Sequence, residues 1–127
     1  MVLHKGQCHC RAVKFEFDGP DTYDMTECNC SICAKTGYQH IFVPEDDFRI
    51  TQGVDKLITY RFGTGQAQHL FCQICGIKAF YRPRSHPESY SVNYRCIEPG
   101  TMTIGKVIAF DGQNWEQNIN ALKDETG

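Results

Sequence analysis

Seven of the eight cysteines stand in three short motifs that could bind metal ions. The motifs are Cys8-His9-Cys10, Cys28-Asn29-Cys30-Ser31-Ile32-Cys33 and Cys72-Gln73-Ile74-Cys75. Cysteines two or three positions apart do not suit a network of structural disulfides, whereas CxC and CxxC pairs bring two thiolates to one ion. We therefore predict metal ligation, with zinc as the metal, in preference to four disulfides.

The first and third motifs can form one closed site. A tetrahedral zinc site of the structural kind has four protein ligands. Those ligands would be Cys8, Cys10, Cys72 and Cys75. Spacing alone does not force this pairing, because other combinations of the thiols remain possible. It has the merit of leaving the central motif together as a second ligand group, Cys28, Cys30 and Cys33.

The central group has two interpretations. With a fourth ligand, either Cys96 or a histidine such as His9 or His40, it would be a second structural site. With three ligands, it would keep one position for water or an incoming thiol, as catalytic zinc sites do. Zinc deprotonates a bound thiol and the thiolate is the nucleophile, so thiol chemistry suits such a site better than hydrolysis.

Short strands must carry these motifs. Alternating apolar and polar residues predict about eight strands, with clear examples at residues 13–17, 22–28 and 57–62. If the segments around Cys8 and Cys28 are extended, each CxC pair points to one face. We also expect one short helical turn over residues 31–36, a hairpin turn at 63–65 and a C-terminal helix over 114–122.

Length and composition narrow the function classes. A chain of 127 residues fits a single domain, 1–127, and no apolar run approaches the roughly 20 residues of a membrane span. The N-terminal residues lack the apolar core of a signal peptide, so we expect a cytoplasmic protein. The net charge of −2, with Arg82-Pro83-Arg84 as the nearest thing to a basic cluster, argues against nucleic-acid binding. The sequence identifies no catalytic or substrate-binding residue besides the candidate ligands.

Several stretches resemble a known enzyme family. These are Gly6-Gln7-Cys8-His9-Cys10 with Val13-Lys14-Phe15, the central motif, and Phe71-Cys72-Gln73-Ile74-Cys75-Gly76. In this order and at these intervals they resemble the glutathione-dependent formaldehyde-activating enzymes. The segments 66–72 and 80–85 are similar to the branch of that family that includes centromere protein V.

The resemblance implies a mainly β, Mss4-like fold of small antiparallel sheets around zinc. It implies two zinc ions, a structural one on Cys8, Cys10, Cys72 and Cys75 and a second on Cys28, Cys30 and Cys33. It further implies a carbon–sulfur lyase that uses glutathione, or a similar thiol, and formaldehyde. Two other hypotheses remain open, a non-catalytic zinc-stabilised module that binds protein or chromatin, and a thiol-based metal or redox buffer.

Overall fold

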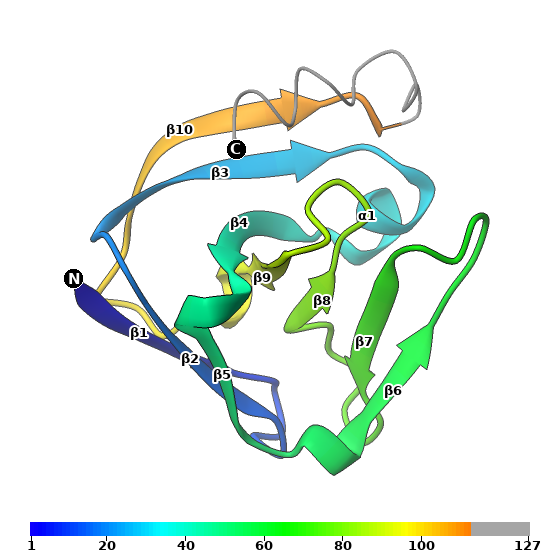
Figure 1. Ribbon diagram of the computed structural model, residues 1–127, viewed down its shortest axis with the longest axis horizontal. Coiled ribbons are helices and arrows are strands. Elements are labelled where there is room, and N and C mark those ends of the chain that lie inside the picture. The colour runs from blue at the N-terminus through cyan, green and yellow to red at the C-terminus, as the bar shows by residue number, and fades with distance from the viewer. Residues whose placement is uncertain (113–127) are drawn as a thin grey trace.

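The computed structural model describes residues 1–112, and these form a mainly β structure, as the sequence predicts (Figure 1). The strands are β1 (Val2–Gln7), β2 (Lys14–Gly19), β3 (Thr22–Cys28), β4 (Gln39–Pro44), β5 (Phe48–Gln52), β6 (Leu57–Tyr60), β7 (Gln68–Cys72), β8 (Phe80–Arg82), β9 (Ser89–Asn93) and β10 (Thr103–Phe110). A short helix, α1 (Ser31–Thr36), follows β3. Single 3-10 turns lie at Glu45–Asp47, Val54–Lys56 and Tyr94–Cys96.

The strands form two sheets. A three-stranded sheet has the order β1-β2-β5, and a seven-stranded sheet has the order β10-β3-β4-β9-β8-β7-β6. All pairs are antiparallel except β10 with β3, which run parallel. The expected antiparallel sheets are thus observed, with one parallel pair at this edge. A parallel pairing depends on where a distant strand returns, and local alternation of residues carries no information about that.

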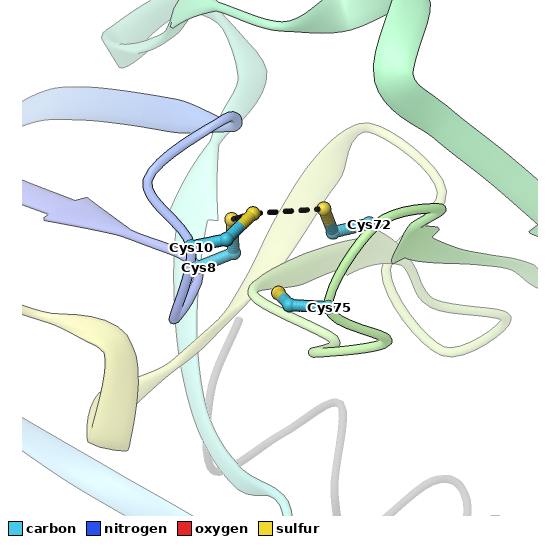
Figure 2. A group of neighbouring side chains, drawn as sticks. All are labelled: Cys8, Cys10, Cys72 and Cys75. Carbon is cyan, nitrogen blue, oxygen red and sulfur yellow. Dashed lines mark hydrogen bonds between the residues drawn. The ribbon is translucent and has the colours of Figure 1, made fainter.

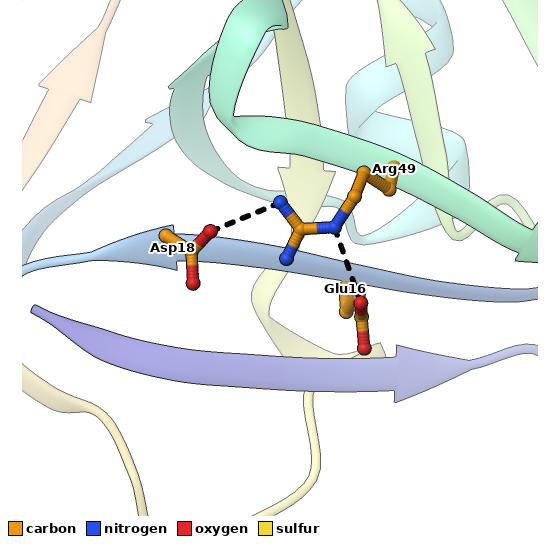
Figure 3. Close-up of polar contacts among 3 residues, drawn as sticks. All are labelled: Glu16, Asp18 and Arg49. Atoms are coloured by element: carbon orange, nitrogen blue, oxygen red, sulfur yellow. Dashed lines mark hydrogen bonds and ion pairs between the residues drawn. The ribbon is translucent and has the colours of Figure 1, made fainter.

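The alternation of apolar and polar residues along β2 explains how the small sheet packs on the large one. In β2, Phe15 and Phe17 are buried while Lys14, Glu16 and Asp18 lie on the other face. This is the period of two that a half-buried strand requires. The outer face of β2 is tied to β5 by Arg49, which donates to Glu16 and Asp18 at 3.1 and 2.9 Å (Figure 3).

The hydrophobic core lies between the two sheets. Phe15 of the small sheet packs edge-to-face on Phe80 of the large sheet, with ring centroids 5.5 Å apart. Phe48 of β5 packs on Phe80 and stacks on Tyr90 of β9. Aliphatic side chains of β4 and β9, including Val43 and Val92, complete the same cluster. Burial of each such side chain contributes about 1.5–3 kcal/mol, so this core holds the sheets together without help from surface ion pairs.

The structure confirms the helical turn and the hairpin that the local sequence predicts. The turn expected at residues 31–36 is α1, which ends at Gly37 in the left-handed conformation. The hairpin expected at 63–65 joins β6 to β7. The expected helix at 114–122 lies outside the described residues. No helix in residues 1–112 is long and apolar enough to cross a membrane.

Candidate metal centres and the adjoining cavity

Four thiols gather where the two sheets meet, and their positions fit one metal ion (Figure 2). They are Cys8, Cys10, Cys72 and Cys75. The sulfur of Cys10 lies 3.6 Å from that of Cys8 and 3.7 Å from that of Cys72. A tetrahedron with Zn–S bonds of about 2.3 Å has edges of about 3.8 Å. We call this set the four-thiol cluster, and the pairing expected from the sequence is brought together in space.

Turn segments deliver Cys8, Cys10 and Cys75, while Cys72 ends strand β7. Cys8 and Cys10 lie in the turn between β1 and β2, so the expectation of an extended CxC pair is wrong here. Arg11, in that turn, has a positive φ of 67°. Its backbone N–H donates to the carbonyl of Cys8, and the N–H of Val13 donates to the Cys8 sulfur at 3.4 Å.

The other half of the cluster is a turn at the end of β7. The backbone N–H of Gly76 donates to the carbonyl of Cys72, and Gly76 has a φ of 78°, which a side chain would disfavour. Burial raises the pKa of Cys75, but backbone N–H groups of Cys10 and Ile77 outweigh it and bring the pKa to about 6. This environment favours the thiolate, which is the form that binds a metal ion.

The central motif forms a second group, which we call the three-thiol cluster: Cys28, Cys30 and Cys33. Its sulfurs all lie within 4.8 Å of one another. Cys28 ends β3, Cys30 precedes α1, and Cys33 is the buried residue of that helix. Hydrogen bonds with the other two sulfurs lower the pKa of Cys30, so the cluster favours at least one thiolate.

Cys96 belongs to neither cluster. No cysteine, histidine or carboxylate among residues 1–112 offers a ligand atom that lies within 4.8 Å of all three sulfurs. Cys96 ends a 3-10 turn, and after burial the charges that raise its pKa to about 11 are those of Cys8 and Cys75. Both of these thiols belong to the four-thiol cluster, so Cys96 lies within the electrostatic reach of that cluster. The interpretation in which Cys96 closes the central group has no support from this geometry.

His40 contacts the three-thiol cluster through the sulfur of Cys33. Its Nε2 lies 3.3 Å from the sulfur of Cys33, and its Nδ1 lies 2.8 Å from Oγ of Ser91. Burial lowers the pKa of His40 to about 3, so the ring is neutral. With Cys33 as a thiolate, Nε2–H donates to the sulfur and Nδ1 accepts from the serine hydroxyl. This contact orients the ligand, as second partners of metal ligands commonly do.

A cavity of about 430 Å³ opens directly onto the three-thiol cluster. Its walls come from the β6–β7 hairpin, the end of β8 and the residues after it, and the segment that follows β10. Aromatic side chains dominate the walls: Phe42, Phe62, Tyr81 and Phe110. Arg84 is the one arginine or lysine among the described lining residues, and none of those residues is acidic. An anionic molecule with an apolar portion would match these walls.

Sequence reasoning missed the polar side chains around this cavity. His69 lines it, and Lys78 lies behind His69 with its ammonium 2.8 Å from the imidazole Nδ1. A lysine in an alternating segment is expected to face solvent. Here Lys78 is 4% exposed while its neighbour Ile77 is 37% exposed, the reverse of the usual arrangement. Both residues lie in the connection between β7 and β8, whose packing the local sequence pattern does not reveal.

Comparisons with known proteins agree with this arrangement. A family model described as glutathione-dependent formaldehyde-activating enzyme matches residues 3–116. A Halomonas elongata protein, provisionally named as such an enzyme, is 32% identical over 82 residues, which are 58% of this chain and 52% of that protein. The chain thus spans about half the length of this curated relative. The crystal structure of a Rhodobacter sphaeroides protein is 37% identical, with a TM-score of 0.69, and covers 76% of this chain and 89% of that one. Since the family model covers nearly the whole chain, the protein belongs to the glutathione-dependent formaldehyde-activating enzyme family.

Proposed function

We propose that the protein is a zinc-dependent carbon–sulfur lyase that acts on adducts of glutathione, or a similar thiol, with small aldehydes such as formaldehyde. The observation that carries this proposal is the three-thiol cluster, which opens into a cavity and has no fourth ligand atom within 4.8 Å of all three sulfurs among residues 1–112. A structural site would be closed by four ligands, and a working site keeps a position free. The family supports the same substrate class.

The two clusters would have different roles, one structural and one catalytic. Cys8, Cys10, Cys72 and Cys75 would hold a structural zinc ion that fastens the sheets to each other. Cys28, Cys30 and Cys33 would hold the working zinc ion. When bound there, zinc supplies an electrostatic field that lowers the pKa of a substrate thiol. Free thiols persist in reducing compartments, so a cytoplasmic location is part of the proposal.

The chain's own residues would orient the substrate and keep water out. His40 holds Cys33 in place through Nε2, and Ser91 fixes the ring. The aromatic walls exclude water from the reacting atoms, and Arg84 can attract a carboxylate of a peptide thiol. In the condensing direction, the thiolate sulfur forms a bond to the aldehyde carbon and the carbonyl electron pair moves to oxygen. The lyase direction is the reverse of that step.

The test is Cys30→Ser, with Cys96→Ser as the matched control because Cys96 lies outside both clusters. Turnover would be followed by exchange NMR of glutathione with formaldehyde, and metal content by native mass spectrometry. We expect Cys30→Ser to lose one of two zinc ions and its turnover, while Cys96→Ser keeps both. Full turnover by the Cys30→Ser protein would overturn the proposal.

A second candidate is a non-catalytic module that binds a protein or chromatin partner. It is favoured by apolar side chains exposed on and beside the edge strand β6, namely Val54, Ile58 and Tyr60. Exposed apolar groups on an edge strand suit a macromolecular partner better than a small thiol. Two tightly held zinc ions, with no response to millimolar glutathione or formaldehyde, would favour this candidate over the lyase.

A further inference from the structure

The buried ammonium group of Lys78 lies beside the cavity, and it has no role in the lyase mechanism proposed so far. The ammonium of Lys78 is 2.8 Å from Nδ1 of His69 and 3.8 Å from the centre of the Tyr81 ring. No carboxylate pairs with it among residues 1–112, where His69 is its one hydrogen-bond partner. Burial of an ammonium group is unfavourable, and the negative charges that offset it are those of Cys33, Cys30 and Cys28, which raise the pKa of Lys78 while burial lowers it. This pair therefore calls for a chemical explanation.

The lysine determines where the histidine carries its proton. An ammonium group has three donors and no acceptor, so it donates to Nδ1 of His69. Nδ1 must then be unprotonated, which places the proton of the neutral ring on Nε2. Burial, followed by the charge of Lys78, lowers the pKa of His69 to about 4, so the ring is neutral near pH 7.

The imidazole that carries this proton lines the cavity. His69 is 5% exposed and lines the cavity that contains the three-thiol cluster. Tyr81 and Phe62 lie nearly parallel to the imidazole, at interplanar angles of 17° and 19°, so the ring edge is left accessible. Nε2 has no partner in residues 1–112, and no fully buried side-chain nitrogen there lacks one. Nε2–H is thus an accessible donor at the wall of the cavity.

We propose that His69 is a catalytic proton donor and acceptor for the thiol–aldehyde reaction and that Lys78 is its positioning residue and proton reservoir. This inference rests on the proposed function and adds the proton path to it. General acid–base groups of this kind contribute about 10²–10⁴-fold to turnover.

The substrate, His69 and Lys78 together account for every proton in the condensation step. As the thiolate sulfur bonds to the aldehyde carbon, the carbonyl electron pair moves to oxygen, and that oxygen takes the Nε2 proton. Nδ1 takes a proton from the Lys78 ammonium in the same step, which leaves a neutral amine. One negative and one positive charge disappear together, so the hemithioacetal and both side chains end neutral.

The next thiol restores the starting state. Its S–H proton passes to Nε2, and the Nδ1 proton returns to the lysine nitrogen. No outside acid, base or oxidant is needed. Burial lowers the pKa of Lys78 to about 8, which brings this exchange within reach near neutral pH.

The experiment compares His69→Gln and Lys78→Met with His4→Gln, a buried histidine outside the cavity, in the zinc-loaded protein. Lys78→Met should fold, because replacing a buried charge by an apolar side chain of similar size is often neutral or stabilising. We expect kcat to fall by about 10²–10³-fold in both cavity variants, with KM changed by less than about threefold. His4→Gln should keep the wild-type kcat wherever it folds.

Nitrogen-15 NMR of the wild-type protein gives a readout that does not depend on turnover. We expect His69 to show a neutral ring protonated at Nε2, and Lys78→Met to abolish that preference. A ring protonated at Nδ1, or an imidazolium, in the wild type would overturn the relay. So would a wild-type kcat in His69→Gln, and that result would leave the lyase function standing. Absence of turnover in the wild-type protein would overturn the lyase function and the relay with it.

Discussion

Removal of one thiol from the four-thiol cluster should cost a large part of the stability of the protein. We choose Cys75→Ser because Cys75 is only partly buried and serine has nearly the same shape, so little packing is lost. A complete structural zinc site contributes about 10–16 kcal/mol in small zinc peptides. An equal share for each of four ligands is about 2.5–4 kcal/mol. That is a large fraction of the roughly 5–15 kcal/mol that separates folded from unfolded domains.

The assay is urea unfolding followed by circular dichroism, with metal counted by native mass spectrometry. For a slope of about 2 kcal/mol per molar urea, the expected loss lowers the unfolding midpoint by about 1–2 M. Gln73→Ser, an exposed change in the same turn, should leave the midpoint where it is.

A chelator separates ligation from packing. After the metal is removed, the wild type and Cys75→Ser should unfold at nearly the same urea concentration, because only the metal distinguishes them. A midpoint difference that persists unchanged in chelator would refute the ligand argument. A Cys75→Ser protein that retains two zinc ions and the wild-type midpoint would refute it as well.

Two further predictions concern the core and the second cluster. Phe15→Ala should lower the free energy of unfolding by about 3–5 kcal/mol, because Phe15 is fully buried against Phe80 between the sheets; a loss below about 1 kcal/mol in urea unfolding would contradict a core shared by both sheets. Gly112→Ala would place its Cβ 2.5 Å from the sulfur of Cys28, so metal affinity at the three-thiol cluster should fall by about 10–100-fold. Competition with a chromogenic chelator measures that affinity, and an unchanged value would show that Gly112 does not restrain the cluster.

The strands and the separate thiol motifs were predictable because their signals are local, whereas the pairing of the first and third motifs joins residues 62 positions apart. Alternation in β2 and the CxC and CxxC spacings each act over a few residues. The surroundings of the cavity depend on residues far apart in sequence, as in the contact of His40 with Ser91, 51 positions away. The burial of Lys78 depends on how the connection between β7 and β8 packs on distant residues, which the sequence of that segment does not specify. Cys96 posed the same difficulty, since its distance from the central motif depends on how β9 returns.

The four-thiol cluster also has a consequence for the order in which the protein is assembled. Its contact between Cys10 and Cys72 spans 62 positions, and the segment between them contains the whole three-thiol cluster. Closing a loop of that length costs about 3.7 kcal/mol of chain entropy by the logarithmic relation, so a metal ion bound across it acts as a cross-link. The second cluster is therefore nested inside a loop that the first one closes. Loss of metal from the outer site should release the inner one, whereas the inner site can empty and refill while the outer cross-link stays closed.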